Sequence, residues 1–213
     1  MEVEEIRTPR LLLKQLHTND VGSQDLEWFH RIWSHELATQ WSSRGPCKSI
    51  GDSQQWMAGI LPRNATGKQV KIAFAVLPIA AGHSPTTDAE ALGIVTLLSS
   101  TFRLPSEAPA GPADDGTVVE LGYLFHPNAW GKGYATESLR AFLGAYVQQR
   151  TAREPGTLFE VRASAHSQNA ASLRVLSKLG FEELGRFEQE GRLPLALHGQ
   201  TSPVVGVHLR MKK

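Results

Sequence analysis

Short apolar runs and helical periodicities alternate along the chain, and together they predict a mixed α/β fold. Runs dense in β-branched, aliphatic and aromatic residues predict strands, whereas apolar positions three and four residues apart predict amphipathic helices. The expected strands are 11–16, 70–78, 92–100, 118–125, 158–165, 181–187 and 204–211. The expected helices are 20–37, 53–60 (capped by Ser49 or Asp52), 135–147, and one that starts after Ser167 or Asn169 and ends at Lys178.

Two connections between these strands have a composition that does not build a core. Residues 79–91 contain proline, threonine and aspartate, and residues 102–117 contain three prolines and an Asp-Asp-Gly turn. Because the strands on either side need one another, both segments are expected to be loop insertions within one domain. That domain is expected to span residues 1–213, with its core from about 8 to 213.

Composition and charge narrow the class of protein. Of 213 residues, 41% are hydrophobic and 20% are charged, which is typical of a globular domain. The net charge of +1 favours neither nucleic acid nor an anionic membrane as a partner. The single cysteine, Cys47, excludes an intrachain disulfide framework, and MEVEEIR at the start is no secretory signal. A soluble cytoplasmic domain is expected, and the sequence leaves monomer and homodimer open.

The most informative stretch joins a strand to a helix through two glycines. The strand VVELGYLF (118–125) contains Gly122, which indicates a bulge or a close backbone approach. His126-Pro127-Asn128 ends the strand, and Gly131-Lys132-Gly133 precedes the amphipathic helix. A helix N-terminus carries about half a positive charge and favours phosphate. The pattern therefore predicts a pyrophosphate-binding turn. The alternative is that the two glycines form only a tight turn before a surface helix.

Two common phosphate-binding motifs do not fit this turn. The dinucleotide fingerprint needs a third glycine where Thr136 stands, and the Walker pattern needs Ser or Thr where Gly133 follows Lys132. The flanking residues indicate a third class. The stretch ELGYLFHPNAWGKGYATESLRAFL (120–143) resembles the acetyl-CoA signature of the GCN5-related N-acetyltransferase (GNAT) superfamily, especially its RimJ/RimL-like branch. A second block, NAASLRVLSKLGF (169–181), resembles the Asn-x-x-Ser helix of that branch.

The resemblance implies a fold and an acetyl-CoA site. The implied fold is a twisted, mostly antiparallel sheet flanked by helices, with a central parallel pair of strands, 118–125 and 158–165, that splays to receive pantetheine. The implied acetyl-CoA contacts are Leu124, Phe125 and His126 for pantetheine; Trp130, Gly131, Lys132, Gly133, Tyr134, Ala135 and Thr136 for pyrophosphate; and Asn169 for either region. Many superfamily members carry Gln or Arg at the Trp130 position. The family also places a helix–loop–helix over the acceptor, so Trp33, His35, Trp41 and Trp56 become candidate acceptor contacts, or else core aromatics.

Acetylation of an amine by a thioester needs a base for the ammonium, a donor for the oxyanion and, in some enzymes, a donor for the departing thiolate. Glu120 is the candidate base, with His126 and His166 as rivals; a glutamate bonded to backbone or to an arginine is the alternative. A backbone N–H freed by a bulge between Gly122 and Phe125 is the candidate oxyanion donor. By resemblance, Ser172 is the candidate donor of a proton to the departing thiolate. The alternative is that its hydroxyl only orders the bound CoA. Leu176 stands where other acetyltransferases carry the tyrosine that protonates the thiolate.

The sequence therefore predicts an acetyl-CoA-dependent N-acetyltransferase that transfers acetyl directly, in a ternary complex, to a primary amine of a small molecule or a peptide N-terminus. No metal is expected, because this chemistry needs none and no cluster with ligand spacing occurs. The alternative is a non-catalytic acyl-CoA-binding or regulatory module that retains only the pyrophosphate turn.

Overall fold

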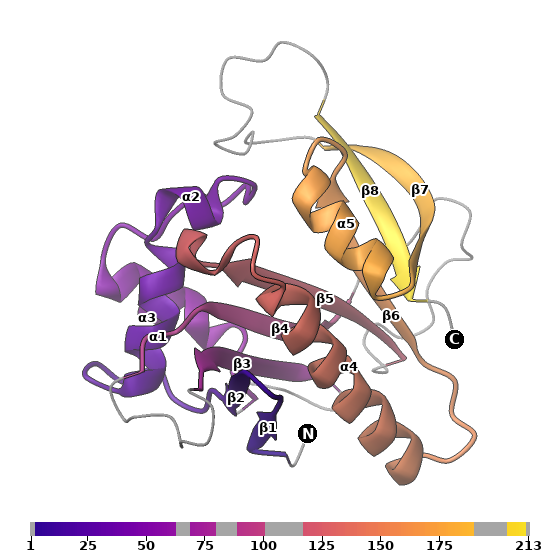
Figure 1. The fold of residues 1–213 in the computed structure, drawn as a ribbon, viewed down its shortest axis with the longest axis horizontal. Coiled ribbons are helices and arrows are strands. Elements are labelled where there is room, and N and C mark those ends of the chain that lie inside the picture. The colour runs from indigo at the N-terminus through magenta and orange to yellow at the C-terminus, as the bar shows by residue number, and fades with distance from the viewer. Residues whose placement is uncertain (1–2, 63–68, 80–88, 101–116, 190–203, 212–213) are drawn as a thin grey trace.

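An eight-stranded sheet organises the computed structural model, which describes residues 3–62, 69–79, 89–100, 117–189 and 204–211. The strands are β1 (Glu5–Arg7), β2 (Leu11–Gln15), β3 (Lys71–Pro78), β4 (Gly93–Ser99), β5 (Val118–Phe125), β6 (Glu160–His166), β7 (Phe181–Gln189) and β8 (Val204–Met211). Their order is β1-β2-β3-β4-β5-β6-β8-β7, and only β5 and β6 pair in parallel (Figure 1). The predicted mixed sheet with a central parallel pair is confirmed.

Helices cover both faces of this sheet. Figure 1 shows α1 (Gln24–Trp33), α2 (Glu36–Thr39) and α3 (Ile50–Ala58) grouped together, apart from α4 (Tyr134–Arg153) and α5 (Ala170–Lys178). The buried side chains form two clusters accordingly. One joins α4 and α5 to the sheet, and the other joins α1 and α3 to its opposite face. The molecule therefore has three layers, with the sheet in the middle.

The sequence of β3 illustrates why the sheet is buried on both sides. Ile72, Phe74 and Val76 lie in the cluster below α4 and α5, whereas Ala73, Ala75 and Leu77 lie in the cluster below α1 and α3. A strand covered on both faces reads as a continuous apolar run rather than an alternating one. The two alanines on the α1–α3 side are short, so they leave room for the large apolar residues of those helices.

The N-terminal helices differ in detail from the prediction. The expected helix 20–37 is two helices, because His35 adopts an extended backbone conformation (φ −83°, ψ 119°) between α1 and α2. Of the two alternatives for the α3 cap, Ser49 is the N-cap: it accepts a hydrogen bond from the Asp52 N–H. Asp52 lies inside the helix and completes a capping box, because its side chain accepts a hydrogen bond from the Ser49 N–H. Strand β1, which precedes residue 8, was not predicted; it pairs with β2.

The expected insertions at 79–91 and 102–117 fall mostly on residues 80–88 and 101–116, which lie outside the described residues. Within the described ranges, no helix is both long and apolar enough to cross a membrane. The same part of the chain contains no group of three His, Cys, Asp or Glu side chains arranged to hold a metal ion.

The expected bulge near Gly122 is absent, and this part of the prediction was wrong. The antiparallel register between β4 and β5 is unbroken from Gly93↔Phe125 to Ser99↔Val119. The alternative reading of Gly122, a close approach, holds: a Cβ there would lie 2.7 Å from Oγ1 of Thr96, the residue opposite it. A side chain at position 122 would therefore require Thr96 on the neighbouring strand to shift.

Two glycine-to-alanine substitutions should have opposite effects on stability. A Cβ at Gly93 would lie 2.5 Å from the Phe125 ring and 2.7 Å from the Leu124 carbonyl oxygen, so Gly93→Ala should lower the free energy of unfolding by about 1–3 kcal/mol. Gly144 lies inside α4 with open space around its Cβ position, so Gly144→Ala should raise that free energy by about 0.5–1 kcal/mol. Urea unfolding followed by circular dichroism measures both, and changes of the same sign would contradict the packing described here.

Candidate active site

The site begins where the two parallel strands part. β5 and β6 pair through only four residue pairs, from Val118↔Glu160 to Leu121↔Ala163. Beyond that point β5 continues along β4 as far as Phe125, whereas β6 continues along β8 as far as His166. Among the described strands, none therefore lies beside the edge of β5 from Gly122 onward on its β6 side.

The hydrogen bonds between β4 and β5 fix which backbone groups face this edge. The N–H of His126 donates to the Leu92 carbonyl (2.8 Å), and the N–H of Ser100 donates to the Val118 carbonyl (3.0 Å). Because backbone groups alternate sides along a strand, the even-numbered residues of β5 bond to β4. The N–H groups of Tyr123 and Phe125 therefore point toward β6.

This alternation separates the three residues expected to contact pantetheine. The backbone groups of Leu124 and His126 are directed toward β4, while those of Phe125 face the unpaired edge. The Phe125 carbonyl already accepts a hydrogen bond from the indole N–H of Trp130 (2.8 Å), so its N–H is the group left for a ligand. Both N–H groups of Trp130 are thus already bonded within the protein, since its backbone N–H donates to the Pro127 carbonyl, although the residue is 46% exposed.

Side chains on β5 point to both faces of the sheet, and the candidate catalytic residues divide between them. Tyr123 packs against the α4–α5 cluster, and Leu124 packs against the α1–α3 cluster. Glu120 is an even number of residues from Leu124 and therefore lies on the α1–α3 face. Ser172, at the start of α5, lies on the other face. A reaction that uses both Glu120 and Ser172 must take place where β5 and β6 diverge.

Glu120 is held by two hydroxyl groups. Ser164 Oγ on β6 donates to Glu120 Oε1 (2.8 Å), and Ser100 Oγ lies 3.4 Å from Glu120 Oε2. Among the described residues, no ion pair is formed by Glu120. Its carboxylate lies at the penultimate residue pair before the strands part.

Ser172 is bound by a tyrosine from the neighbouring strand. The Tyr123 hydroxyl lies 2.6 Å from Ser172 Oγ and 3.2 Å from the Ser172 carbonyl oxygen. Burial raises the pKa of Tyr123 to about 12, against an opposing effect of its hydrogen bond with Ser172. Asn169 caps α5, because its Oδ1 accepts from the Ser172 N–H (3.1 Å); its side-chain NH₂ has no described partner.

The glycine turn has the backbone geometry that its sequence requires. A 3₁₀ turn, η2 (Pro127–Ala129), leads into Gly131 and Gly133, whose φ angles are +73° and +79°. Such values favour glycine, whatever the space around them. Gly133 is the N-cap of α4 and supplies no capping side chain, so within the described part of the chain the first N–H groups of α4, from Tyr134 to Thr136, have no side-chain cap.

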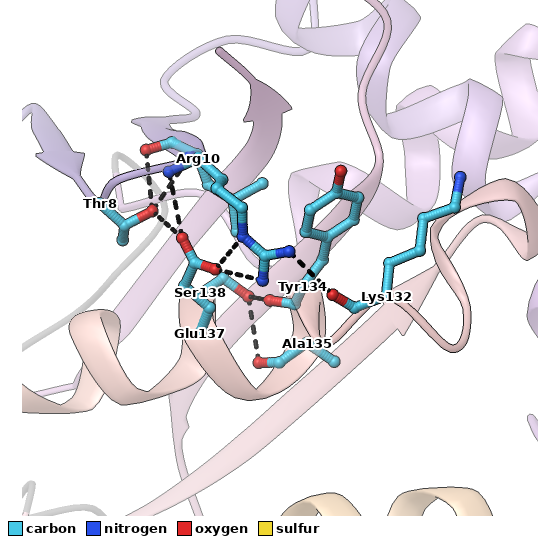
Figure 2. Close-up of polar contacts among 8 residues, drawn as sticks. Thr8, Arg10, Lys132, Tyr134, Ala135, Glu137 and Ser138 are labelled. Atoms are coloured by element: carbon cyan, nitrogen blue, oxygen red, sulfur yellow. Dashed lines mark hydrogen bonds and ion pairs between the residues drawn. The ribbon is translucent and has the colours of Figure 1, made fainter. Parts of the chain in front are cut away.

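A cluster of polar contacts fastens this turn to the N-terminal strands (Figure 2). Arg10 Nε and Nη2 lie 2.7 and 2.5 Å from Glu137 Oε2, and Arg10 Nη1 donates to the Lys132 carbonyl (3.1 Å). Thr8 Oγ1 donates to Glu137 Oε1 (2.6 Å), and the Arg10 guanidinium lies 4.8 Å from the centre of the Tyr134 ring. The Lys132 side chain extends away from this cluster. We call these residues, Thr8, Arg10, Lys132, Tyr134 and Glu137, the Arg10 clasp.

The clasp neutralises the one acidic residue of the first turn of α4. Burial alone would raise the pKa of Glu137, but hydrogen bonds from Thr8 and Arg10, with the charge of Arg10, hold that pKa below its ordinary value. Glu137 is therefore an anion paired with Arg10, so its charge is directed away from the N-terminus of α4. That terminus keeps its preference for an added anion.

His126, a rival for the role of base, lies on the α1–α3 face. Its Nδ1 accepts from the Asn128 N–H (3.3 Å), and its ring contacts His35 edge-on at 4.6 Å. Burial lowers the pKa of His126 most, and the positive charge of Arg31 lowers it further. His126 is therefore neutral at pH 7, with one ring nitrogen occupied.

Of the four candidate acceptor contacts on the N-terminal segment, two lie against the ends of β5 and β6 and two do not. His35 contacts His126 just past β5, and Trp41 stacks on His166 at the end of β6 (5.3 Å). Trp33 and Trp56 instead contact each other within the helical layer (5.4 Å). The Trp41–His166 stack brings the segment after α2 against the strand that carries Ser164.

Sequence reasoning assigned no role to Tyr123 or to the Arg10–Glu137 pair. The signals were present but indirect: Tyr123 is part of the acetyl-CoA signature, Arg10 belongs to the Thr-x-Arg start of β2, and Glu137 is an acidic residue in a first helical turn. The partners of these residues are 49 and 127 positions away, which no local pattern indicates.

A sheet that parts at a central parallel pair, beside a glycine turn and an uncapped helix, defines a class of acyl-CoA-dependent transferase. Residues 10–182, most of the chain, match the family model described as the acetyltransferase (GNAT) domain. The chain belongs to the GNAT acetyltransferase family.

The proteins to which this chain is similar differ widely from it in sequence. An uncharacterised Bacillus subtilis protein, YkkB, is 36% identical over 67 residues, which is 32% of this chain and 36% of YkkB. The match thus spans about a third of that relative. A GNAT-family acetyltransferase structure from Bacillus anthracis covers 97% of both chains with a TM-score of 0.63 and 19% identity. A Vibrio cholerae spermidine N-acetyltransferase, solved with CoA and spermine, covers 96% of this chain and 97% of its own with a TM-score of 0.63 and 15% identity.

The Arg10 clasp should make stability depend on pH in the acid range. Because the folded-state pKa of Glu137 lies below its ordinary value of 4.5, its carboxylate stabilises the fold above that pH, and this contribution is lost as pH falls through the folded-state pKa. Glu137→Gln should therefore cost about 1–2 kcal/mol of unfolding free energy at pH 7 and progressively less below about pH 4.

Urea unfolding of wild type and variant across this pH range measures the difference. The control is Glu183→Gln, which removes the carboxylate of an exposed pair with Arg186 and should change stability little at any pH. A Glu137→Gln cost that stays constant down to pH 3 would contradict the assignment.

Proposed function

We propose that the protein is an acetyl-CoA-dependent N-acetyltransferase that transfers acetyl directly to a primary amine of a small molecule or a peptide N-terminus. One observation carries the proposal: the unpaired edge of β5, at Tyr123 and Phe125, leads within a few residues into the uncapped N-terminus of α4. An extended amide-bearing arm can add to the first as a strand does, and its pyrophosphate can bind the second.

The division of residues between the two faces of the sheet supports an order of events. On the α1–α3 face, Glu120 would take a proton from the acceptor ammonium, since an amine of pKa near about 10 has no free electron pair at neutral pH. The neutral amine then attacks the thioester carbon at the divergence of the strands. The Tyr123 N–H, which faces the same edge nearer the divergence, would donate to the oxyanion and leave the Phe125 N–H to the pantetheine arm. It would take the place of the bulge-derived donor expected from the sequence.

The position of the only cysteine supports direct transfer. Cys47 is 3% exposed and lies in the loop before α3, so it is not placed to carry an acetyl group between donor and acceptor. Both substrates would therefore be bound together when the acetyl group moves.

The second block of the sequence supports placement in the RimJ/RimL-like branch. Asn169 and Ser172 lie in the cap and first turn of α5, and Leu176, one turn later, is 1% exposed in the core where other acetyltransferases carry a tyrosine. The acceptor within that branch is tested by experiment. Spermidine is the acceptor named for the Vibrio cholerae protein and is one member of the panel.

The test is acetyl transfer from acetyl-CoA to a panel of amines, followed by thiol release and by the mass of the product. The panel contains a dipeptide, a free amino acid, spermidine and an aminoglycoside. An acetylated product, with initial-velocity lines that intersect when both substrates are varied, supports direct transfer. Parallel lines would indicate an acetylated enzyme, and CoA binding without transfer would indicate an acyl-CoA-binding module.

Glu120→Gln should slow this transfer selectively. Loss of the base should lower kcat by roughly a hundredfold, while acetyl-CoA affinity stays within about twofold of wild type, because Glu120 lies on the face away from the glycine turn. The matched control, Glu27→Gln, changes an exposed glutamate on α1 and should leave both unchanged. An unaltered pH–rate profile for Glu120→Gln would remove Glu120 from this role.

A further inference from the structure

The hydroxyl pair of Tyr123 and Ser172 joins the two elements that part at the site. Tyr123 comes from β5 beyond its last pair with β6, and Ser172 comes from the first turn of α5. Among the described residues, the Tyr123 hydroxyl contacts only Ser172, and no group other than Tyr123 is placed to accept the Ser172 hydroxyl proton.

The geometry allows two arrangements of the two protons. If the phenol donates to the Ser172 carbonyl (3.2 Å), the serine proton points at the phenol oxygen and is not available to a ligand. If the phenol donates to Ser172 Oγ (2.6 Å), the serine proton is free to point away from Tyr123. The 2.6 Å separation fits either donor, but a phenol is more acidic than an aliphatic alcohol and is therefore the better donor. This favours the second arrangement, in which Ser172 accepts one hydrogen bond and has one to give.

We propose that Tyr123 is a positioning residue that donates to Ser172 Oγ and so directs the Ser172 hydroxyl toward the sulfur of the departing coenzyme A. The inference rests on the proposed function, because it assigns a role within acetyl transfer. It adds a residue on β5 to a function that the sequence assigned to Ser172 alone.

The step needs a hydrogen bond and no transfer of the serine or tyrosine proton. As the tetrahedral intermediate collapses, the C–S bond breaks, its electron pair goes to sulfur, and the Ser172 O–H stabilises the thiolate. A thiol has an ordinary pKa of about 8.5, whereas the pKa of Tyr123 is about 12, so the phenol would not give its proton to the thiolate. The proton removed from the amine through Glu120 leaves to water.

The test is the pKa of the CoA thiol bound to the intact protein, which requires no knowledge of the acceptor. The ultraviolet absorbance of the thiolate is titrated in the CoA complex, with the desulfo-CoA complex as the blank. In wild type the bound thiol should have a lower pKa than free CoA. Tyr123→Phe should raise it by about one unit, a tenfold change, and Ser172→Ala should raise it at least as far.

Controls separate this role from a loss of packing. Tyr146→Phe removes another buried phenol from the same cluster, one whose hydroxyl has no partner among the described residues, and should leave the thiol pKa unchanged. Ser172→Thr keeps a hydroxyl and should restore most of the effect. Adding Tyr123→Phe to Ser172→Ala should cause no further shift, since the tyrosine acts through the serine.

The outcomes distinguish the inference from the function on which it rests. If wild type binds CoA but Tyr123→Phe leaves the thiol pKa unchanged, or shifts it equally with and without Ser172, the inference is wrong and the proposed function stands. If wild type binds no CoA, both are wrong. Tyr123→Phe should also lower the rate of acetyl transfer roughly tenfold with acetyl-CoA affinity unchanged, and a loss in affinity alone would contradict a role at the sulfur.

Discussion

The candidate site depends on one constraint: the parallel ladder between β5 and β6 stops after four residue pairs. If the two strands stayed paired to their ends, the N–H groups of Tyr123 and Phe125 would bond to β6, and α5 would have no route to the edge of β5. Because each strand keeps its other neighbour, β4 or β8, the sheet remains continuous while its centre parts. The divergence is thus held open by two antiparallel ladders rather than by a flexible loop.

The sheet also keeps the two halves of the proposed chemistry apart. Glu120 lies on the side of the helices α1–α3, while Tyr123 and Ser172 lie on the side of α4 and α5, so the removal of a proton from the amine and the stabilisation of the thiolate would occur on opposite sides. The Arg10 clasp is a second feature that positions the site. It binds the glycine turn to the start of β2 through Arg10 and Glu137, two charged residues that leave the N-terminus of α4 free to bind an anion.

The sequence predicted those features that depend on local chemistry. β5 was predicted at its observed bounds, and the glycine turn was recognised because left-handed φ angles favour glycine. It could not predict contacts between distant segments: the phenol of Tyr123 on Ser172, the Arg10 clasp, or the Trp41–His166 stack. The wrong reading of Gly122 as a bulge has the same origin, because only the Thr96 side chain on the next strand explains that glycine. The break at His35 depends on backbone angles that apolar spacing does not report.

The central claim is that this divergence and the glycine turn together bind acetyl-CoA, and calorimetric titration tests it most directly. Wild type should bind both acetyl-CoA and desulfo-CoA with micromolar affinity, about −8 kcal/mol. Gly133→Val should weaken both by at least about tenfold through strain at a left-handed position, whereas Gly156→Val, at a similar φ of +80° after α4, should leave affinity unchanged. Absence of binding by wild type, or equal affinities for the two variants, would contradict the account.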